Sequence, residues 1–160
     1  MHQDPSLSMR YFKWGVARLI LESDPAPDLL PIFIDGTQHI MAEDRKWPRF
    51  LPRIGAKVKV VFGPLVDGSR FDEARAKWRD LVSRSRASRR QNMNGTSEHD
   101  LDDLPEDLRY GDAVSQLRIE VARQVRDEVS KLRRGLGYPE EKSGLGLAET
   151  WKEPAIAKHG

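Results

Sequence analysis

The chain has 160 residues, enough for one domain with a hydrophobic core but too few to predict two. Hydrophobic residues make up 38% and charged residues 32%, which indicates that part of the length is solvated loop or tail. The absence of cysteine excludes disulfides, thiolate zinc sites and cysteine nucleophiles.

The formal net charge of +2 is unevenly distributed. Residues 1–90 carry 17 basic and 11 acidic side chains, whereas residues 91–134 carry 7 and 10. The first part therefore favours an anionic partner and the second does not. The apolar runs at residues 16–21 and 29–34 fall far short of the roughly 20 residues that span a bilayer. Residues 1–5 show no signal-peptide pattern, so neither a targeting signal nor a transmembrane helix is predicted.

The first predicted elements are one helix and two strands. Apolar spacing predicts a helix over residues 6–23. The apolar run at 29–34 does not alternate, which is typical of a strand covered on both faces in a parallel sheet, with Pro31 at its start or at a bulge. A loop over 36–52 follows, and the alternating, β-branched residues 57–62 predict the second strand.

The second half of the chain is predicted to be helical with irregular stretches. Apolar spacing predicts a helix from Phe71 to about Ser85, and the basic and then acidic residues that follow favour a linker of low order. Valine and leucine at helical spacing predict a helix over 112–134. Residues 135–160 contain five glycines and two prolines and are expected to form a flexible tail.

Four phrases carry a family resemblance. They are Arg10-Tyr-Phe-Lys-Trp-Gly-Val-Ala-Arg-Leu-Ile-Leu-Glu22, Leu30-Pro-Ile-Phe-Ile-Asp-Gly36, Pro48-Arg-Phe-Leu-Pro-Arg-Ile-Gly55 and Lys57-Val-Lys-Val-Val-Phe-Gly-Pro64. Their order resembles the C-terminal part of the tafazzin family of phospholipid acyltransferases, and the second phrase is similar to the fourth motif of glycerolipid acyltransferases. Beyond Gly68 the resemblance thins to a helix-forming pattern, and the long linker and the helix over 112–134 look like extensions found in fungal-type members.

The resemblance implies an α/β fold, the C-terminal portion of a mixed sheet with packed helices, plus an extra C-terminal helix. The corresponding division is a partial acyltransferase domain at 1–87, a linker at 88–111, a helix at 112–134 and a tail at 135–160. An incomplete sheet exposes a strand edge and an uncovered apolar face. We therefore expect the isolated chain to be only marginally stable.

The resemblance also implies an activity: transacylation between phospholipids and lysophospholipids in cardiolipin remodelling. It implies peripheral attachment to mitochondrial membranes, and it calls for no cofactor and no metal. The family's His-x4-Asp and Phe-Pro-Glu-Gly motifs are expected before residue 1, so no catalytic residue is assigned and the chain alone is predicted to be inactive. The spacing of His39 and Asp44 matches His-x4-Asp, but it follows the fourth-motif strand and is interpreted as coincidence.

Five residues are candidates for substrate binding. Arg10 and Lys13 are expected to contact lipid phosphates or to form an ordinary solvated helix face, two readings that the sequence leaves open. Trp14 is expected to anchor at a membrane interface. By resemblance, Pro31 and Phe33 line the path of the acyl chain, whereas by composition alone they belong to a buried strand.

Two alternatives to the enzyme remain. One is a non-catalytic remnant that binds lipids or a partner at membranes. The other is a nucleic-acid-binding protein that uses the basic run Arg84–Arg90, but the acidic residues that follow favour a solvated linker, and no nucleic-acid partner is predicted. The sequence does not predict the oligomeric state.

Overall fold

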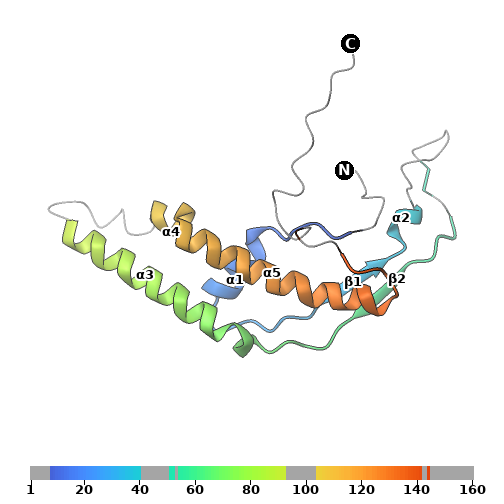
Figure 1. Ribbon diagram of the computed structural model, residues 1–160, viewed down its shortest axis with the longest axis horizontal. Coiled ribbons are helices and arrows are strands. Elements are labelled where there is room, and N and C mark those ends of the chain that lie inside the picture. Colours follow the sequence, from blue (N-terminus) through green and yellow to red (C-terminus); the bar gives the residue numbers. More distant parts are fainter. Residues whose placement is uncertain (1–7, 41–50, 53, 93–103, 142–143, 145–160) are drawn as a thin grey trace, which may run out of the picture. The chain divides into compact units, whose positions relative to one another are not determined.

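The computed structural model describes residues 8–40, 51–52, 54–92, 104–141 and 144. These residues form α-helices, a short 3-10 helix and two strands, which confirms the mixed α/β class (Figure 1). The chain divides into two compact units. Unit 1 comprises Met1–Phe12, Leu30–Leu65 and Val125–Gly160, and unit 2 comprises Lys13–Leu29 and Val66–Gln124.

Unit 1 contains a two-stranded sheet. Strand β1 (Ile32–Asp35) pairs antiparallel with β2 (Lys59–Phe62), side by side in Figure 1. The sequence predicted that the first strand would belong to a parallel sheet. For the described residues this prediction is wrong, because β1 runs antiparallel to β2, the next strand along the chain. Pro31 directly precedes β1, which confirms its predicted place at the start of the strand, where no ladder N–H is needed.

The sheet has one covered and one exposed face. The register pairs Ile32 with Phe62 and Ile34 with Val60, so these four side chains lie on one face. Their exposed fractions are 42%, 63%, 52% and 47% in that order. We call these four residues the open face. The prediction that the first strand is covered on both sides is thus wrong, whereas the uncovered apolar face expected of an incomplete sheet is present.

Two glycines beside the sheet occupy positions where a side chain would come too close to neighbouring atoms. Gly36 follows β1 with φ of 93°, a left-handed conformation that favours glycine, and a Cβ there would lie 2.2 Å from the carbonyl oxygen of Lys57. Gly63 follows β2, and a Cβ there would lie 2.9 Å from the Pro31 ring and 3.1 Å from Leu132. The short helix α2 (Thr37–Ile40) lies within the predicted loop, whose residues 41–50 are outside the described part.

In unit 2, helix α1 (Trp14–Glu22) begins eight residues later than predicted. Its N-terminal boundary residue, Lys13, is extended and provides no side-chain cap. The buried residues of α1 are Ala17, Ile20 and Leu21, whereas Leu19 is 66% exposed. Of the apolar residues whose spacing predicted this helix, Ile20 is therefore buried and Leu19 is not.

Helix α3 (Asp72–Asn92) follows the 3-10 helix η1 (Gly68–Phe71) and is longer than predicted. Asp67 caps η1 by accepting a hydrogen bond from the Ser69 N–H at 2.7 Å. Acidic residues occupy the first turn of α3 and arginines its last turn, which matches the helix dipole at both ends. The basic run predicted to belong to a linker is thus helical as far as Asn92.

Two more helices complete the described part. Helix α4 (Glu106–Tyr110) lies within the predicted linker, and α5 (Asp112–Gly135) confirms the helix predicted over 112–134. The buried apolar residues of unit 2 include Phe71, Trp78, Leu108, Val114 and Val121. None of the helices in the described part is both long and apolar enough to cross a membrane.

Candidate functional site

Helix α5 carries three buried arginines. Arg118, Arg126 and Arg133 are only 3%, 6% and 1% exposed. They recur in helical register with the buried Ala122 and Val125, so the apolar stripe of α5 includes three cations. Because a buried charge is costly unless it is paired and hydrogen-bonded, each guanidinium needs specific partners.

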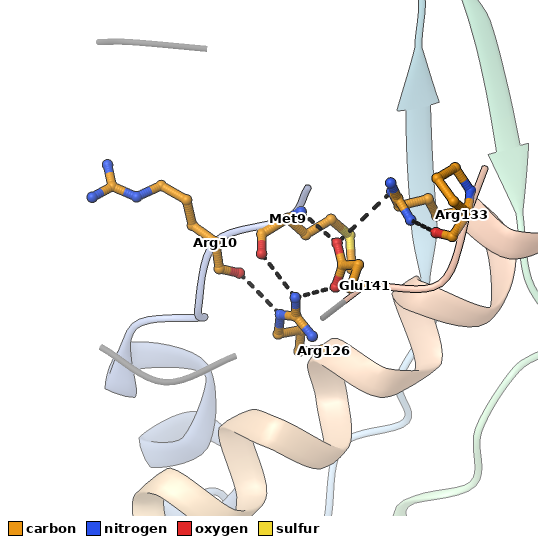
Figure 2. Close-up of polar contacts among 6 residues, drawn as sticks. Met9, Arg10, Arg126, Arg133 and Glu141 are labelled. Carbon is orange, nitrogen blue, oxygen red and sulfur yellow. Dashed lines mark hydrogen bonds and ion pairs between the residues drawn. The ribbon is translucent and has the colours of Figure 1, made fainter. Parts of the chain in front are cut away.

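In unit 1, Arg126 is paired with Glu141 (Figure 2). The Arg126 Nη2 donates to the Glu141 carboxylate and to the Met9 carbonyl oxygen at 2.8 Å. The Arg126 Nε donates to the Arg10 carbonyl oxygen at 3.2 Å, and the Met9 N–H donates to Glu141 at 2.6 Å. We call Met9, Arg10, Arg126, Arg133 and Glu141 the Glu141 cluster. Because the backbone of residues 9 and 10 is used here, it does not continue the predicted first helix.

Arg133 joins the cluster from the other side. Its Nε lies 3.8 Å from the Glu141 carboxylate, and its Nη1 donates to the Pro139 carbonyl oxygen at 2.6 Å. Its guanidinium carbon is 5.0 Å from the centre of the Tyr138 ring, within the range of a cation–π contact. Residues 138–141, predicted to belong to a flexible tail, therefore pack against α5.

Tyr138 connects the same segment to β1. Its hydroxyl donates to the Asp35 carboxylate at 2.5 Å, and its ring meets Phe33 edge to face with 6.2 Å between ring centres. Gln38 donates to the same carboxylate at 3.2 Å. The Tyr138 hydroxyl and then Gln38 lower the pKa of Asp35, and the hydrogen bond to the Asp35 carboxylate raises the pKa of Tyr138.

In unit 2, Arg118 has aromatic and backbone partners. Its guanidinium carbon lies 5.9 Å from the Trp14 ring centre and 5.6 Å from that of Trp78. Its two terminal nitrogens donate to the carbonyl oxygens of Arg109 and Leu108 in α4, at 2.8 and 3.0 Å. Its Nε has no hydrogen-bond partner among the described residues, and its Nη2 lies 3.7 Å from a carboxylate oxygen of Glu22. Burial lowers the pKa of Arg118, and the Glu22 charge partly offsets this.

The five predicted substrate-binding residues do not gather at one site within either unit. Arg10 lies in unit 1, where its carbonyl belongs to the Glu141 cluster and its side chain points away from it (Figure 2). Lys13 and Trp14 lie in unit 2. Lys13 is exposed, and Trp14 is 39% exposed beside Arg118.

Pro31 and Phe33 lie together in unit 1. Pro31 is buried, and its carbonyl accepts a hydrogen bond from the Gly63 N–H at 2.8 Å. Phe33 is half-buried against Tyr138, on the sheet face opposite Ile32 and Ile34. Their predicted role in acyl-chain binding stays a prediction.

His39 is exposed, and Asp44, its partner in the His-x4-Asp spacing, lies outside the described part. Within the described ranges, no three His, Cys, Asp or Glu side chains gather in a group that could hold a metal ion.

The sequence interpretation missed the buried arginines, Tyr138 and Glu141. The arginines had a detectable signal, because Arg118, Arg126 and Arg133 fall in register with the valines of α5. Glu141 and Tyr138 had none, since their partners lie in a distant strand and helix and no local spacing indicates such contacts.

Comparison with known proteins connects the chain to a curated relative. No family model matches the chain. The chain is similar to tafazzin of Saccharomyces cerevisiae, with 31% identity over 150 residues that cover 91% of this chain. The chain spans 37% of the length of that relative. This likeness confirms the predicted resemblance to the tafazzin family over nearly the whole chain.

Proposed function

We propose that the chain is the C-terminal portion of a tafazzin-like phospholipid acyltransferase. Such an enzyme moves acyl chains between phospholipids and lysophospholipids, cardiolipin among them, and attaches peripherally to mitochondrial membranes. The likeness to yeast tafazzin supports this family assignment. The observation that carries the proposal is the open face of the two-stranded sheet.

The open face favours a role within a larger sheet. Isolated two-stranded sheets are marginally stable, and contiguous exposed apolar patches indicate interaction sites. Here Ile32, Ile34, Val60 and Phe62 face one side, while the other side packs through Phe33 and Tyr138. We place the catalytic half of the acyltransferase domain over the open face, with Pro31 and Phe33 near the acyl chain.

The same proposal assigns the acid–base chemistry elsewhere. In acyl transfer to a hydroxyl group, a histidine removes the hydroxyl proton and an aspartate orients the imidazole. In our proposal the 160 residues supply the sheet and its packing, and the His-x4-Asp pair comes from the catalytic half. The 160 residues alone should therefore show no acyl transfer, and turnover that is lost in His39→Ala would overturn this assignment.

A chimera tests the proposal directly. The matching part of yeast tafazzin would be replaced by this chain, and transfer of a labelled acyl group from phosphatidylcholine to a lysocardiolipin would be measured in detergent micelles. We expect activity well above that of yeast tafazzin lacking the replaced part. A folded but inactive chimera would contradict the proposal.

Substitution of the open face provides the specific control. In the chimera, Ile34→Asn places an amide where apolar packing is proposed, and we expect most of the activity to be lost. Leu19→Asn is the matched variant, because Leu19 is also exposed, at 66%, but lies on α1 in unit 2. Equal losses in both variants would argue against packing at the open face.

A further inference from the structure

Helix α3 carries more positive charge than its contacts with the described residues use. Of its seven basic residues, Arg75 donates to a backbone carbonyl of α1 at 2.6 Å. Lys77 and Arg84 form ion pairs with carboxylates one turn earlier, and Arg89 also has an interaction. These four cations are thus accounted for within the protein.

The other three, Arg79, Arg86 and Arg90, have no hydrogen-bond or ion-pair partner among the described residues. Their spacing of seven and then four residues places them within an arc of about 40° on the helix. The rise of the helix separates Arg79 from Arg86 by about 10 Å and Arg86 from Arg90 by about 6 Å. They therefore form a single cationic stripe along α3.

The stripe borders a shallow, open groove of about 520 Å³, which is lined entirely by residues of α3. The same groove is lined by Val82, Ser83 and Ala87, with the buried Trp78 among its walls. Its lining thus combines guanidinium groups, one hydroxyl donor and short apolar side chains. This combination suits a phosphate-bearing ligand with an adjoining apolar part.

We propose that the Arg79–Arg86–Arg90 stripe docks the protein on an anionic phospholipid surface, an inference that rests on the lipid chemistry of the proposed function. Clusters of arginine and lysine on an amphipathic helix bind anionic headgroups, and each cation near the surface adds to the affinity. The stripe presents its cations in one line, as contact with a flat surface requires. The groove beside it accepts a headgroup and the start of its acyl chains.

The lining favours lipid over nucleic acid. Binding of single strands relies on exposed aromatic rings for base stacking, and Trp78, the aromatic side chain of the groove, is only 6% exposed. A duplex groove surrounds a helix on several sides, whereas Arg79, Arg86 and Arg90 occupy one narrow arc. Charge complementarity and the apolar walls together indicate a lipid headgroup.

Vesicle co-sedimentation of the full chain tests the docking surface. The probes are phosphatidylcholine vesicles with and without phosphatidylglycerol, at increasing salt concentration. We expect binding that requires the anionic lipid and weakens with salt. The triple variant Arg79→Gln, Arg86→Gln, Arg90→Gln should bind on the order of 100-fold more weakly. Glutamine keeps the helix propensity of these positions, and circular dichroism would verify the helix content.

A second triple variant removes the same net charge elsewhere. Lys77→Gln, Arg84→Gln, Arg123→Gln eliminates three exposed cations that already have carboxylate partners. We expect this second variant to weaken vesicle binding far less. The variant Arg79→Lys, Arg86→Lys, Arg90→Lys keeps the charge and should retain binding. Equal losses in the two glutamine variants, or no binding of the wild-type chain to anionic vesicles, would overturn the proposal.

Nucleic acid is the competing ligand for the stripe, and a separate competition experiment tests it. A duplex or single-stranded oligonucleotide that displaces the chain from vesicles and depends on the same three arginines would assign the stripe to nucleic acid instead. Because co-sedimentation involves no turnover, its failure leaves acyl transfer by the chimera unaffected. Conversely, an inactive chimera with intact, arginine-dependent vesicle binding would contradict only the proposed enzyme.

Discussion

Arg126 and Arg118 are buried on the same helix, yet their surroundings differ. Arg126 in unit 1 has a carboxylate partner, Glu141, which also binds the backbone of Met9. Arg118 in unit 2 lies near two tryptophan rings and donates to two carbonyl groups, with its nearest carboxylate 3.7 Å away. Both guanidinium groups thus donate to two backbone carbonyls, but Arg126 also donates to a carboxylate, whereas Arg118 has two ring contacts and only a longer ion pair. We therefore expect the loss of one acidic side chain to lower the free energy of unfolding more in unit 1 than in unit 2.

The largest expected effect comes from Glu141→Ala. It leaves Arg126 buried without its counter-ion, and we expect the free energy of unfolding to fall by about 3–5 kcal/mol. Urea denaturation followed by circular dichroism measures the change, and amide hydrogen exchange should rise in residues 8–12 and β1. Glu140→Ala is the matched control, since that side chain is 84% exposed and should cost well below about 1 kcal/mol. Similar costs for the two variants would contradict the comparison.

Arg118→Met is the corresponding destabilising substitution in unit 2. It removes two hydrogen bonds to α4 carbonyls and two ring contacts while keeping an apolar stem, so we expect a loss of about 2 kcal/mol. Arg118→Lys sharpens the result, because an ammonium group cannot reproduce the planar guanidinium fork. A lysine variant as stable as the wild-type chain would show that charge alone matters at this position.

Tyr138→Phe removes the hydrogen bond to Asp35 and should cost about 1 kcal/mol at neutral pH. The lowered pKa of Asp35 means that its contribution is present above its unfolded-state pKa and is lost as the pH falls through the folded-state pKa. The raised pKa of Tyr138 means that its contribution is present below its unfolded-state pKa and is lost as the pH rises through the folded-state pKa. The stability difference between wild type and variant should therefore shrink in strong acid and in alkali, as unfolding curves across pH would reveal. A difference independent of pH would argue against this hydrogen bond.

Glu22→Gln should have the smallest effect. Glu22 is 29% exposed and pairs with Arg18, which is itself 54% exposed, so water and salt screen both ends. We expect a loss below about 1 kcal/mol that disappears at high ionic strength. A cost equal to that of Glu141→Ala would mean that Glu22 is the essential counter-ion of Arg118.

Local patterns predicted the long elements well. The spacing of Val114, Val121 and Val125 placed α5 almost to the residue, because helical periodicity depends on near neighbours. The alternation of residues 57–62 indicated β2, and Pro31 marked the start of β1. The apolar run at 29–34 predicted a strand covered on both faces, which was wrong. The uncovered face was expected from the incomplete sheet that the resemblance implies, and the register of β1 and β2 places it at Ile32 and Ile34.

Long-range contacts determined what local patterns did not predict. The first helix starts at Trp14 instead of Ser6, and the backbone of Met9 and Arg10 binds Arg126 and Glu141, more than a hundred residues away in sequence. The basic run after Ser85 remains helical because its arginines suit the end of α3. Local spacing also could not place the five predicted substrate-binding residues relative to one another, because their positions depend on long-range contacts.

The segment 138–141 has a consequence for any shortened form of the protein. A boundary placed at the end of α5, after Gly135, looks natural because the helix is complete there. It would nevertheless remove Pro139 and Glu141, leaving the guanidinium groups of Arg126 and Arg133 without these partners in the interior. A proteolytic fragment or engineered truncation that keeps unit 1 folded should therefore extend at least to residue 141.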